Sequence, residues 1–268
     1  MQSISDIING FNAQLTLLSS ERLHSGLSND NFLVRAALNN QQYAYLLKSY
    51  RDHWPTLGLA AQARFAQLQL CPKPLWLDKA NRLAIFEYIE GDTAQSNYTP
   101  ELIKKLVSLH CHNVVSEAMN IKQELDFYQH TALYQQYSQT VSVAVAEIEK
   151  LPRDEGFCHN DLVKENIIEN PQGMFLIDFE YAKTNDVYFD LAAIAVSFEL
   201  DREGKQQLLK TYQQQLPLSQ RFYCSINKLE YYQVVFLVLC VCWYSDRSIN
   251  EKVMPLCAQL DALIALQH

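Results

Sequence analysis

Three side chains with oxygen donors lie close together in the sequence, and their types suit one kind of chemistry. Asp161 precedes Asn166 by five residues, and Asp178 follows Asn166 by twelve. Carboxylate and amide oxygens are ligands for a hard cation such as Mg2+, and a further carboxylate can orient and deprotonate a hydroxyl that attacks a phosphate. We therefore expect Asn166 and Asp178 to bind a metal and Asp161 to hold a hydroxyl.

A predicted hairpin would bring these side chains together. An Asn-Pro-Gln-Gly turn signal at 170–173 separates two apolar runs. If the hairpin centres on Gln172, Asn166 and Asp178 lie opposite each other at its open end, and Asp161 lies in the loop that enters this end. Each residue alone would more often cap a turn, but the joint spacing favours a site.

The upstream part of the chain is predicted to be rich in strands. Its apolar periodicity indicates a hairpin with strands over 32–38 and 43–48 around Asn39-Asn40, a helix over 57–70 that Pro72 and Pro74 end, and a buried strand over 82–89.

The downstream part is predicted to be mainly helical. Glu90-Gly91-Asp92 breaks the last upstream strand, and the next helix begins with Thr99 as N-cap and Pro100 at its first position. We place a boundary near Gly91, so the expected domains are 1–90 and 91–268.

The motif His159-x-Asp161-x-x-x-x-Asn166, followed by Ile177-Asp178-Phe179, resembles the catalytic and metal-binding segments of the kinase-like fold. Ile-Asp-Phe-Glu-Tyr-Ala at 177–182, with Phe-Asp-Leu-Ala at 189–192, is similar to the choline, ethanolamine and thiamine kinase branch of the aminoglycoside phosphotransferase and choline kinase superfamily. This resemblance implies an α+β, bilobal protein-kinase-like fold. It also implies ATP and Mg2+ as cofactors, a nucleotide-binding lobe over 1–90, and a catalytic and acceptor-binding lobe over 91–268.

The resemblance also implies which upstream residues contact the nucleotide. Ser28 and Asn29, in a turn over 25–31, would cradle phosphates, Lys48 would pair with the α- and β-phosphates, and the backbone of Glu87 and Ile89 would face adenine. An ordinary hairpin turn and a solvated lysine are the alternatives for the turn and for Lys48.

One feature departs from the superfamily pattern. Relatives pair the strand lysine with a glutamate of the following helix, but no Asp or Glu occurs between Asp52 and Asp78. Gln62 could offer its side-chain oxygen to Lys48, or an acidic partner could come from elsewhere in the chain.

The acceptor is expected to be a small-molecule alcohol that carries a positive charge. Glu180 and Asp186 supply carboxylates, and Trp243 an aromatic face, for a cationic alcohol such as choline, ethanolamine or thiamine; core packing explains Trp243 equally well. An aminoglycoside-type or other small-molecule kinase and a nucleotide-binding pseudokinase are alternatives. A protein kinase is disfavoured, because no Ala-Pro-Glu segment follows Asp178. We expect His159 and Asp190 to hold the catalytic loop rather than touch substrate.

Composition excludes other classes of partner. The formal charge of −8, without a Lys/Arg run, opposes binding to nucleic acid. Seven cysteines without a C-x-x-C pair indicate reduced thiols.

Residues 1–11 show no secretory signal, so a cytoplasmic location is expected. The apolar window 231–244 is shorter than the roughly 20 residues of a membrane span and contains Gln233, so we expect a buried helix and no membrane association. The sequence does not indicate an oligomeric state.

Overall fold

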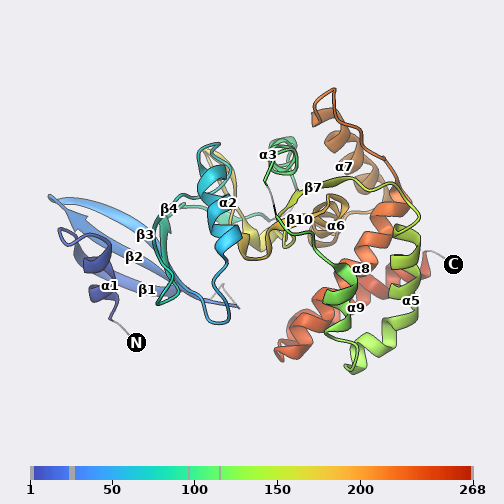
Figure 1. Ribbon diagram of the computed structural model, residues 1–268, viewed down its shortest axis with the longest axis horizontal. Helices are drawn as coiled ribbons and strands as arrows, with labels where there is room; N and C mark the ends of the chain where they lie inside the picture. Colours follow the sequence, from blue (N-terminus) through green and yellow to red (C-terminus); the bar gives the residue numbers. More distant parts are fainter. Residues whose placement is uncertain (1–2, 24–27, 96, 115, 267–268) are drawn as a thin grey trace. The chain divides into compact units, whose positions relative to one another are not determined.

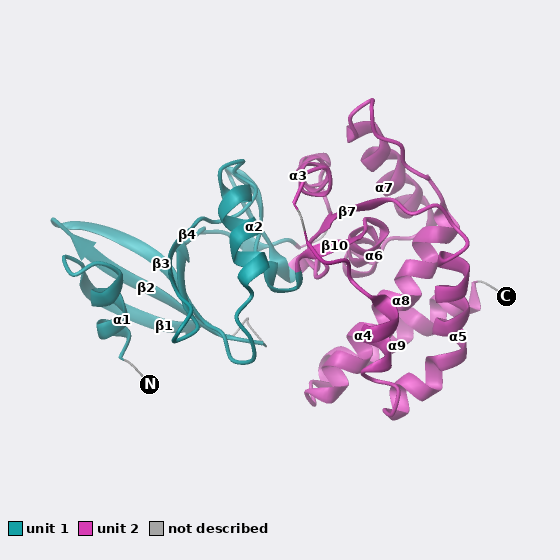
Figure 2. Cartoon of the chain, viewed as in Figure 1, with its two compact units in different colours: residues 1–94, 165–181 teal, residues 95–164, 182–268 magenta. Residues whose placement is uncertain are grey.

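The computed structural model describes residues 3–23, 28–95, 97–114 and 116–266. The chain forms two compact units (Figure 2): unit 1 holds residues 1–94 and 165–181, and unit 2 holds 95–164 and 182–268. The segment 165–181 lies beyond the boundary expected near Gly91, yet it belongs to unit 1. The Leu176 N–H donates to the Leu70 carbonyl at 2.9 Å, and strand β8 (Ile167–Asn170) within this segment pairs with the upstream strand β6 (Asp92–Thr93).

Unit 1 is built on antiparallel strands (Figure 1). One sheet has five strands in the order β1-β2-β3-β5-β4, and a second sheet has three strands in the order β6-β8-β9. The elements of unit 1 are α1 (Ile4–Phe11), β1 (Thr16–Leu23), β2 (Asp30–Leu38), β3 (Gln41–Ser49), α2 (Thr56–Ala66), β4 (Pro74–Asp78), β5 (Leu83–Glu87), β6 (Asp92–Thr93), β8 (Ile167–Asn170), β9 (Gly173–Leu176) and the short 3-10 helices Lys164–Asn166, which begins at the last residue before this segment, and Phe179–Tyr181.

The predicted hairpin β2–β3 is confirmed. Asn39 and Asn40 join the strands with φ angles of 51° and 65°. Two successive left-handed residues are what a tight hairpin turn requires, and asparagine tolerates that conformation better than most residues.

Each face of the five-stranded sheet packs against its own helix. On one face, Ile8 of α1 packs with Val34 and Ile85. On the other face, Leu59 of α2 packs with Ala84. Because Lys48 lies opposite Ala84 in the β3–β5 register, its side chain lies on the face that α2 covers.

Two boundaries in unit 1 differ from the sequence-based expectation. Helix α2 ends at Ala66 rather than at residue 70, because Gln69 takes a φ of 56° and the chain has turned before the prolines. Pro74 begins β4, which was not predicted. Proline is tolerated there since β4 is an edge strand and Pro74 is its first residue.

The predicted hairpin in segment 165–181 forms, but its register is shifted by one residue. Asn170 pairs with Gly173, so the turn centres between Pro171 and Gln172 rather than on Gln172. The Ile177 N–H donates to the Asn166 carbonyl at 2.9 Å. Asn166 therefore faces Ile177, and Asp178 is the next residue along.

Unit 2 is mainly helical. Its elements are α3 (Pro100–His110), α4 (Ile121–Asp126), α5 (Ala132–Ile148), β7 (Glu155–Cys158), β10 (Lys183–Asp186), α6 (Tyr188–Ser197), α7 (Arg202–Gln215), α8 (Ile226–Asp246) and α9 (Asn250–Ala265). The start of α3 is as predicted, with Thr99 as N-cap and Pro100 first in the helix. The antiparallel pair β7–β10 was not fully predicted, because the sequence of β10, Lys-Thr-Asn-Asp, has no apolar alternation.

Helix α8 contains the apolar window. At 21 residues it is longer than the window, and among the described residues it is the one helix whose length and composition would suit a membrane span. However, 61% of its most apolar stretch is buried within the protein, with Val234, Leu237 and Val241 almost fully covered. This burial confirms the prediction of a buried helix.

Candidate active site

The sequence-predicted site residues fall into a group in unit 1 and a group in unit 2. In unit 1, the central contact joins Lys48 and Asp178, whose Nζ and Oδ1 atoms are 2.6 Å apart. Lys48 is 5% exposed, and its ammonium also lies 5.1 Å from the centre of the Tyr50 ring. A buried ammonium requires such partners, because desolvation of an unpaired charge is costly.

Asp178 is held in an unusual backbone conformation. It follows β9 and has a φ of 65°, which is sparsely populated by residues other than glycine and is found at functional sites. Its side chain is 29% exposed. The carboxylate can therefore contact Lys48 and still be reached by an ion from solvent.

Asn29 and Glu180 form a second contact in unit 1. The Asn29 amide donates from Nδ2 to Glu180 Oε2 at 2.5 Å, and its oxygen accepts the Arg51 N–H at 3.2 Å. Asn29 is only 4% exposed, so its side chain binds protein groups instead of facing solvent. Of the expected phosphate turn, residues 25–27 lie outside the described part of the chain, and Ser28 is half-buried.

Glu180 lies in a strongly perturbed environment. Burial raises the pKa of its carboxyl group, and the nearby charge of Asp178 raises it further. Lys48 and the hydrogen bond from Asn29 act in the opposite direction and favour the charged form. His53 Nδ1 lies 3.9 Å from Glu180 Oε1.

Helix α2 approaches the segment that carries Asp178 through a glycine, Gly58. A Cβ atom on Gly58 would lie 2.0 Å from the Phe179 carbonyl oxygen, so only glycine allows this approach. On the same helix, the Gln62 side chain donates to the Pro72 carbonyl at 3.0 Å. Gln62 thus does not replace the glutamate that superfamily members carry in this helix to pair with the strand lysine. The acidic partner of Lys48 is Asp178.

The expected adenine-binding backbone lies at the end of β5. The Glu87 N–H donates to the Lys73 carbonyl at 2.9 Å, so this N–H group is already paired within unit 1. Ile89 follows the strand and is half-buried.

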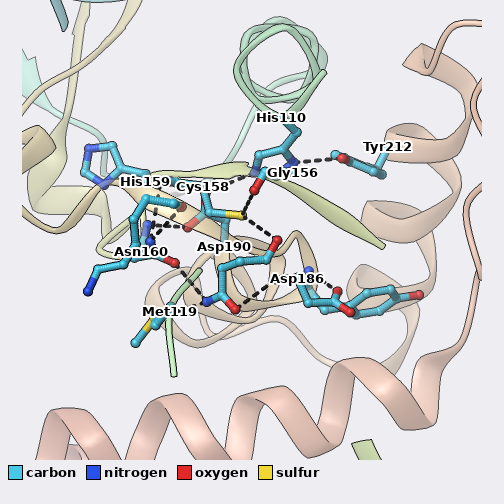
Figure 3. Close-up of polar contacts among 12 residues, drawn as sticks. His110, Met119, Gly156, Cys158, His159, Asn160, Asp186, Asp190 and Tyr212 are labelled. Carbon is cyan, nitrogen blue, oxygen red and sulfur yellow. Dashed lines mark hydrogen bonds and ion pairs between the residues drawn. The ribbon is translucent and has the colours of Figure 1, made fainter. Parts of the chain in front are cut away.

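In unit 2, Asp190 holds the loop that contains the second group (Figure 3). Asp190 is fully buried, and its two oxygens accept the backbone N–H groups of His159 at 2.7 Å and Asn160 at 2.8 Å. This geometry agrees with the expected loop-holding role. The positions immediately before Asp161 are therefore fixed by one side chain of α6.

Asn160 adds side-chain ties to the same loop. Its φ is 62°, its Nδ2 donates to the Lys183 carbonyl at 3.2 Å, and its Oδ1 accepts from Asn185 at 2.9 Å. Asp161, the next residue, is half-buried.

A histidine and a tyrosine that sequence reasoning missed support Asp190. His110 Nε2 lies 3.0 Å from Asp190 Oδ2, and His110 Nδ1 lies 2.7 Å from the Tyr212 hydroxyl. The hydroxyl proton of Tyr212 can satisfy Nδ1, which leaves Nε2–H to donate to the carboxylate. Nothing in the sequence distinguishes His110 from other polar residues of an amphipathic helix.

Asp186 forms a buried ion pair. Its Oδ2 lies 2.7 Å from Lys228 Nζ, and Lys228 also contacts Asp154 at 2.7 Å. Burial raises the pKa of the Asp186 carboxyl group, while Lys228 opposes this shift. The arrangement gives Asp186 a structural partner that the sequence did not indicate.

Trp243 lies near the end of α8, and one ring face is covered. The Arg247 guanidinium lies 4.0 Å from the centre of the Trp243 ring, and Tyr244 packs edge-on against the same ring at 5.1 Å. Trp243 itself is half-buried.

Two sets of residues carry groups that could bind a metal ion. The carboxylate of Asp178 and the amide of Asn166 offer the oxygen atoms that Mg2+ prefers, so the donor chemistry fits. His110, Cys158 and Asp190 also have ligand atoms within 4.8 Å of one another. Burial raises the pKa of the Cys158 thiol, which disfavours the thiolate a metal needs, and Asp190 already accepts backbone hydrogen bonds.

Comparison with known proteins establishes the family. The sequence profile of the phosphotransferase enzyme family matches residues 19–221. The chain belongs to this family. The resemblance inferred from Asp161, Asn166 and Asp178 is thereby confirmed.

Individual relatives support the same placement. Protein LicA of Haemophilus influenzae is 46% identical over 55 residues, which are 20% of this chain and 21% of that protein; the aligned part is thus well under two thirds of the relative. The structure of choline kinase LicA from Streptococcus pneumoniae has a TM-score of 0.75 and 24% identity, covering 96% of this chain and 98% of that one. Aminoglycoside 2'-phosphotransferase-IIIa, solved with GDP, has a TM-score of 0.68 and 11% identity over 98% of both chains.

The structural similarity confirms the predicted fold class. This family member has the kinase-like fold, with antiparallel strands in its N-terminal region and helices in its C-terminal region.

Proposed function

We propose that this protein is a small-molecule kinase that transfers the γ-phosphate of ATP, with Mg2+, to the hydroxyl of a cationic alcohol such as choline or ethanolamine. The observation that carries the proposal is the 2.6 Å contact between Lys48 and Asp178. This contact supports the proposal because it joins the lysine that we propose to bind phosphates to the carboxylate that we propose to bind Mg2+, in a chain whose family transfers phosphate.

Each residue has a distinct proposed role. Lys48 binds the α- and β-phosphates, and the Glu87 carbonyl and the Ile89 backbone face adenine. Asn166 and Asp178 hold Mg2+, which would neutralise charge on the phosphates when bound. Asp161 orients the acceptor hydroxyl and takes its proton. Asp190 supports this role, because it fixes the backbone immediately before Asp161.

The choice of acceptor rests on the relatives. The solved structure with a TM-score of 0.75 is named a choline kinase, and the sequence relative that is 46% identical over its aligned part carries the same LicA name. The similarity to an aminoglycoside phosphotransferase keeps that acceptor class as the second candidate.

The test is an acceptor panel. ADP release is measured with Mg2+ and ATP in the presence of choline, ethanolamine, thiamine, an aminoglycoside or a neutral sugar. We expect turnover with one of the first three. Turnover with the aminoglycoside alone would support the second candidate, and no turnover with any acceptor would favour a pseudokinase.

A further inference from the structure

The Lys48 ammonium has two contacts of different kinds. Among the residues that the structure describes, it contacts the carboxylate of Asp178 at 2.6 Å and the ring of Tyr50, whose centre lies 5.1 Å from Nζ. Helix α2 carries no Asp or Glu, and its Gln62 side chain donates to the Pro72 carbonyl. The strand lysine thus has a neutral ring as its second partner and receives no acid from the helix that follows.

Tyr50 is held in place at the end of the same strand. Its N–H donates to the Arg82 carbonyl at 2.9 Å, which extends the β3–β5 pairing by one residue. Side chains two residues apart in an extended chain point to the same side, so Tyr50 shares the α2 face of the sheet with Lys48. There it is 6% exposed and packs in one cluster with Leu59 of α2. The ring of Trp54 meets it nearly at right angles, with the two centres 5.5 Å apart.

A ring and a carboxylate hold an ammonium in different ways. The face of the ring attracts the cation through its quadrupole, and this attraction is stronger where water is excluded, as it is around the buried Lys48. The ring has no net charge, so it neither neutralises the ammonium nor repels the phosphates of a nucleotide. Asp178 belongs to the proposed Mg2+ site, and a carboxylate that binds a metal ion attracts a lysine less strongly. The contact with Tyr50 does not depend on the metal.

We propose that Tyr50 is a positioning residue for Lys48. The face of its ring holds the ammonium where ATP phosphates bind, in the role that a helix glutamate has in other superfamily members. A free lysine side chain has many rotamers, and a ring that restricts them beforehand reduces the entropy lost when a nucleotide binds. This role rests on the proposed function, because it presumes that Lys48 binds the phosphates of ATP.

The first test compares Tyr50→Leu with wild type by calorimetric titration of Mg-ATP and of ATP without metal. Leucine keeps an apolar side chain in the cluster but removes the aromatic face. We expect the Kd of Mg-ATP to rise about two- to tenfold, the range for ordering one long side chain on binding. The Kd of metal-free ATP should rise less, because the charge of Asp178 is then available to Lys48 alone.

Two further variants separate the ring from general packing. Tyr50→Phe keeps the aromatic face and should restore the wild-type Kd; a loss as large as that of Tyr50→Leu would assign the effect to the hydroxyl group and overturn the inference. Tyr45→Leu is the matched control, because it makes the same change in β3 on the opposite face, where Tyr45 packs against Phe11 of α1 at 5.4 Å. Its Kd for Mg-ATP should equal that of wild type.

A double-mutant cycle tests whether Tyr50 acts through the lysine. In a Lys48→Met protein, Tyr50→Leu should cause no further loss of Mg-ATP affinity, because the cation that the ring holds is gone. If Tyr50 instead touched the nucleotide itself, its loss would persist in the Lys48→Met protein. That result would overturn the positioning role.

Trp54→Leu provides a second variant in case Tyr50→Leu is poorly folded, which thermal unfolding would reveal. It removes the ring that packs against Tyr50 and should raise the Kd of Mg-ATP in the same direction, by a smaller factor. Unchanged Mg-ATP affinity in the folded variants would refute the role of Tyr50 and leave the proposed function standing. Failure of the wild-type protein to bind Mg-ATP would refute both.

Discussion

Asp190 Oδ1 accepts the backbone N–H of Asn160 at 2.8 Å, which joins helix α6 to the residue immediately before Asp161. Both groups are buried, and the other Asp190 oxygen accepts from His159. A buried carboxylate that accepts several hydrogen bonds is rigid, because each alternative position would leave backbone N–H groups unsatisfied. The position of Asp161 therefore depends on a side chain that need not touch substrate.

Asp190→Asn should lower both stability and turnover. The asparagine side chain has only one oxygen. Its NH2 group would therefore face one of the two backbone N–H groups, of His159 or Asn160, that Asp190 accepts, and that hydrogen bond would be lost. The free energy of unfolding should fall by about 2 kcal/mol, the scale of a lost charged hydrogen bond, and kcat should fall more than ATP affinity. Asp201→Asn is the matched control, because Asp201 caps α7 at the surface and Asn caps helices equally well. Unchanged unfolding and kcat in Asp190→Asn would contradict the loop-holding role.

Asp161→Ala should abolish turnover and leave ATP affinity nearly unchanged. Its proposed task is to orient and deprotonate the acceptor hydroxyl, and such groups typically contribute about 10²- to 10⁴-fold to the rate. Steady-state rates combined with nucleotide titration measure the two effects separately. Retention of more than about a tenth of wild-type activity, on that scale, would exclude Asp161 as the base.

Asp178→Asn should weaken Mg-ATP binding, because the side chain loses the charge that attracts the cation and that pairs with Lys48. Titration of Mg-ATP should show a higher Kd, while metal-free ATP should change less. Asp92→Asn removes an exposed carboxylate from β6 in the same unit and should have no effect. Equal Mg-ATP affinity in Asp178→Asn and wild type would rule out the metal-binding role.

Gly58→Ala should destabilise the protein and displace the segment that carries Asp178. The added methyl group would lie 2.0 Å from the Phe179 carbonyl oxygen, a backbone atom that cannot move aside easily. We expect a lower unfolding temperature and a raised Kd for Mg-ATP. Gly10→Ala is the control: it lies in α1 with no atom within 4 Å of the added carbon, so it should be neutral or stabilising. Similar unfolding curves for the two variants would show that the contact at Gly58 is unimportant.

The sequence predicted those parts of the fold that local chemistry determines. The turn at Asn39 and Asn40 and the helix start at Thr99 and Pro100 follow from preferences of a few adjacent residues. Strand β10 was missed, because its polar residues form a strand only by pairing with β7, a partner distant in the sequence.

The same distinction applies to the candidate site. The motif around Asp161 and Asp178 indicated the family, since its spacing is local. The contacts of Asp178 and Glu180 could not be predicted, because each joins residues far apart in the sequence. Lys48 is 130 residues from Asp178, and Asn29 is 151 residues from Glu180. Lys228, which pairs with Asp186, likewise gave no signal, because a lysine in an apolar helix reads as a solvated charge until its burial is known.

Trp243→Leu tests whether an aromatic face of α8 contacts a cationic acceptor. The Trp243 ring already attracts one cation, because the Arg247 guanidinium lies 4.0 Å from its centre. Cation–π attraction contributes about 0.5 to 2 kcal/mol, so the variant should raise the acceptor's KM several-fold and leave the KM of ATP unchanged. Arg247→Ala is the companion variant. It removes the competing cation but keeps the ring, so it should lower the acceptor's KM or leave it unchanged. If Trp243 only packs in the core, Trp243→Leu would reduce the unfolding temperature without a selective effect on the KM of the acceptor. In the acceptor panel, robust phosphorylation of neutral sugars and of no cationic alcohol would exclude a cationic acceptor altogether.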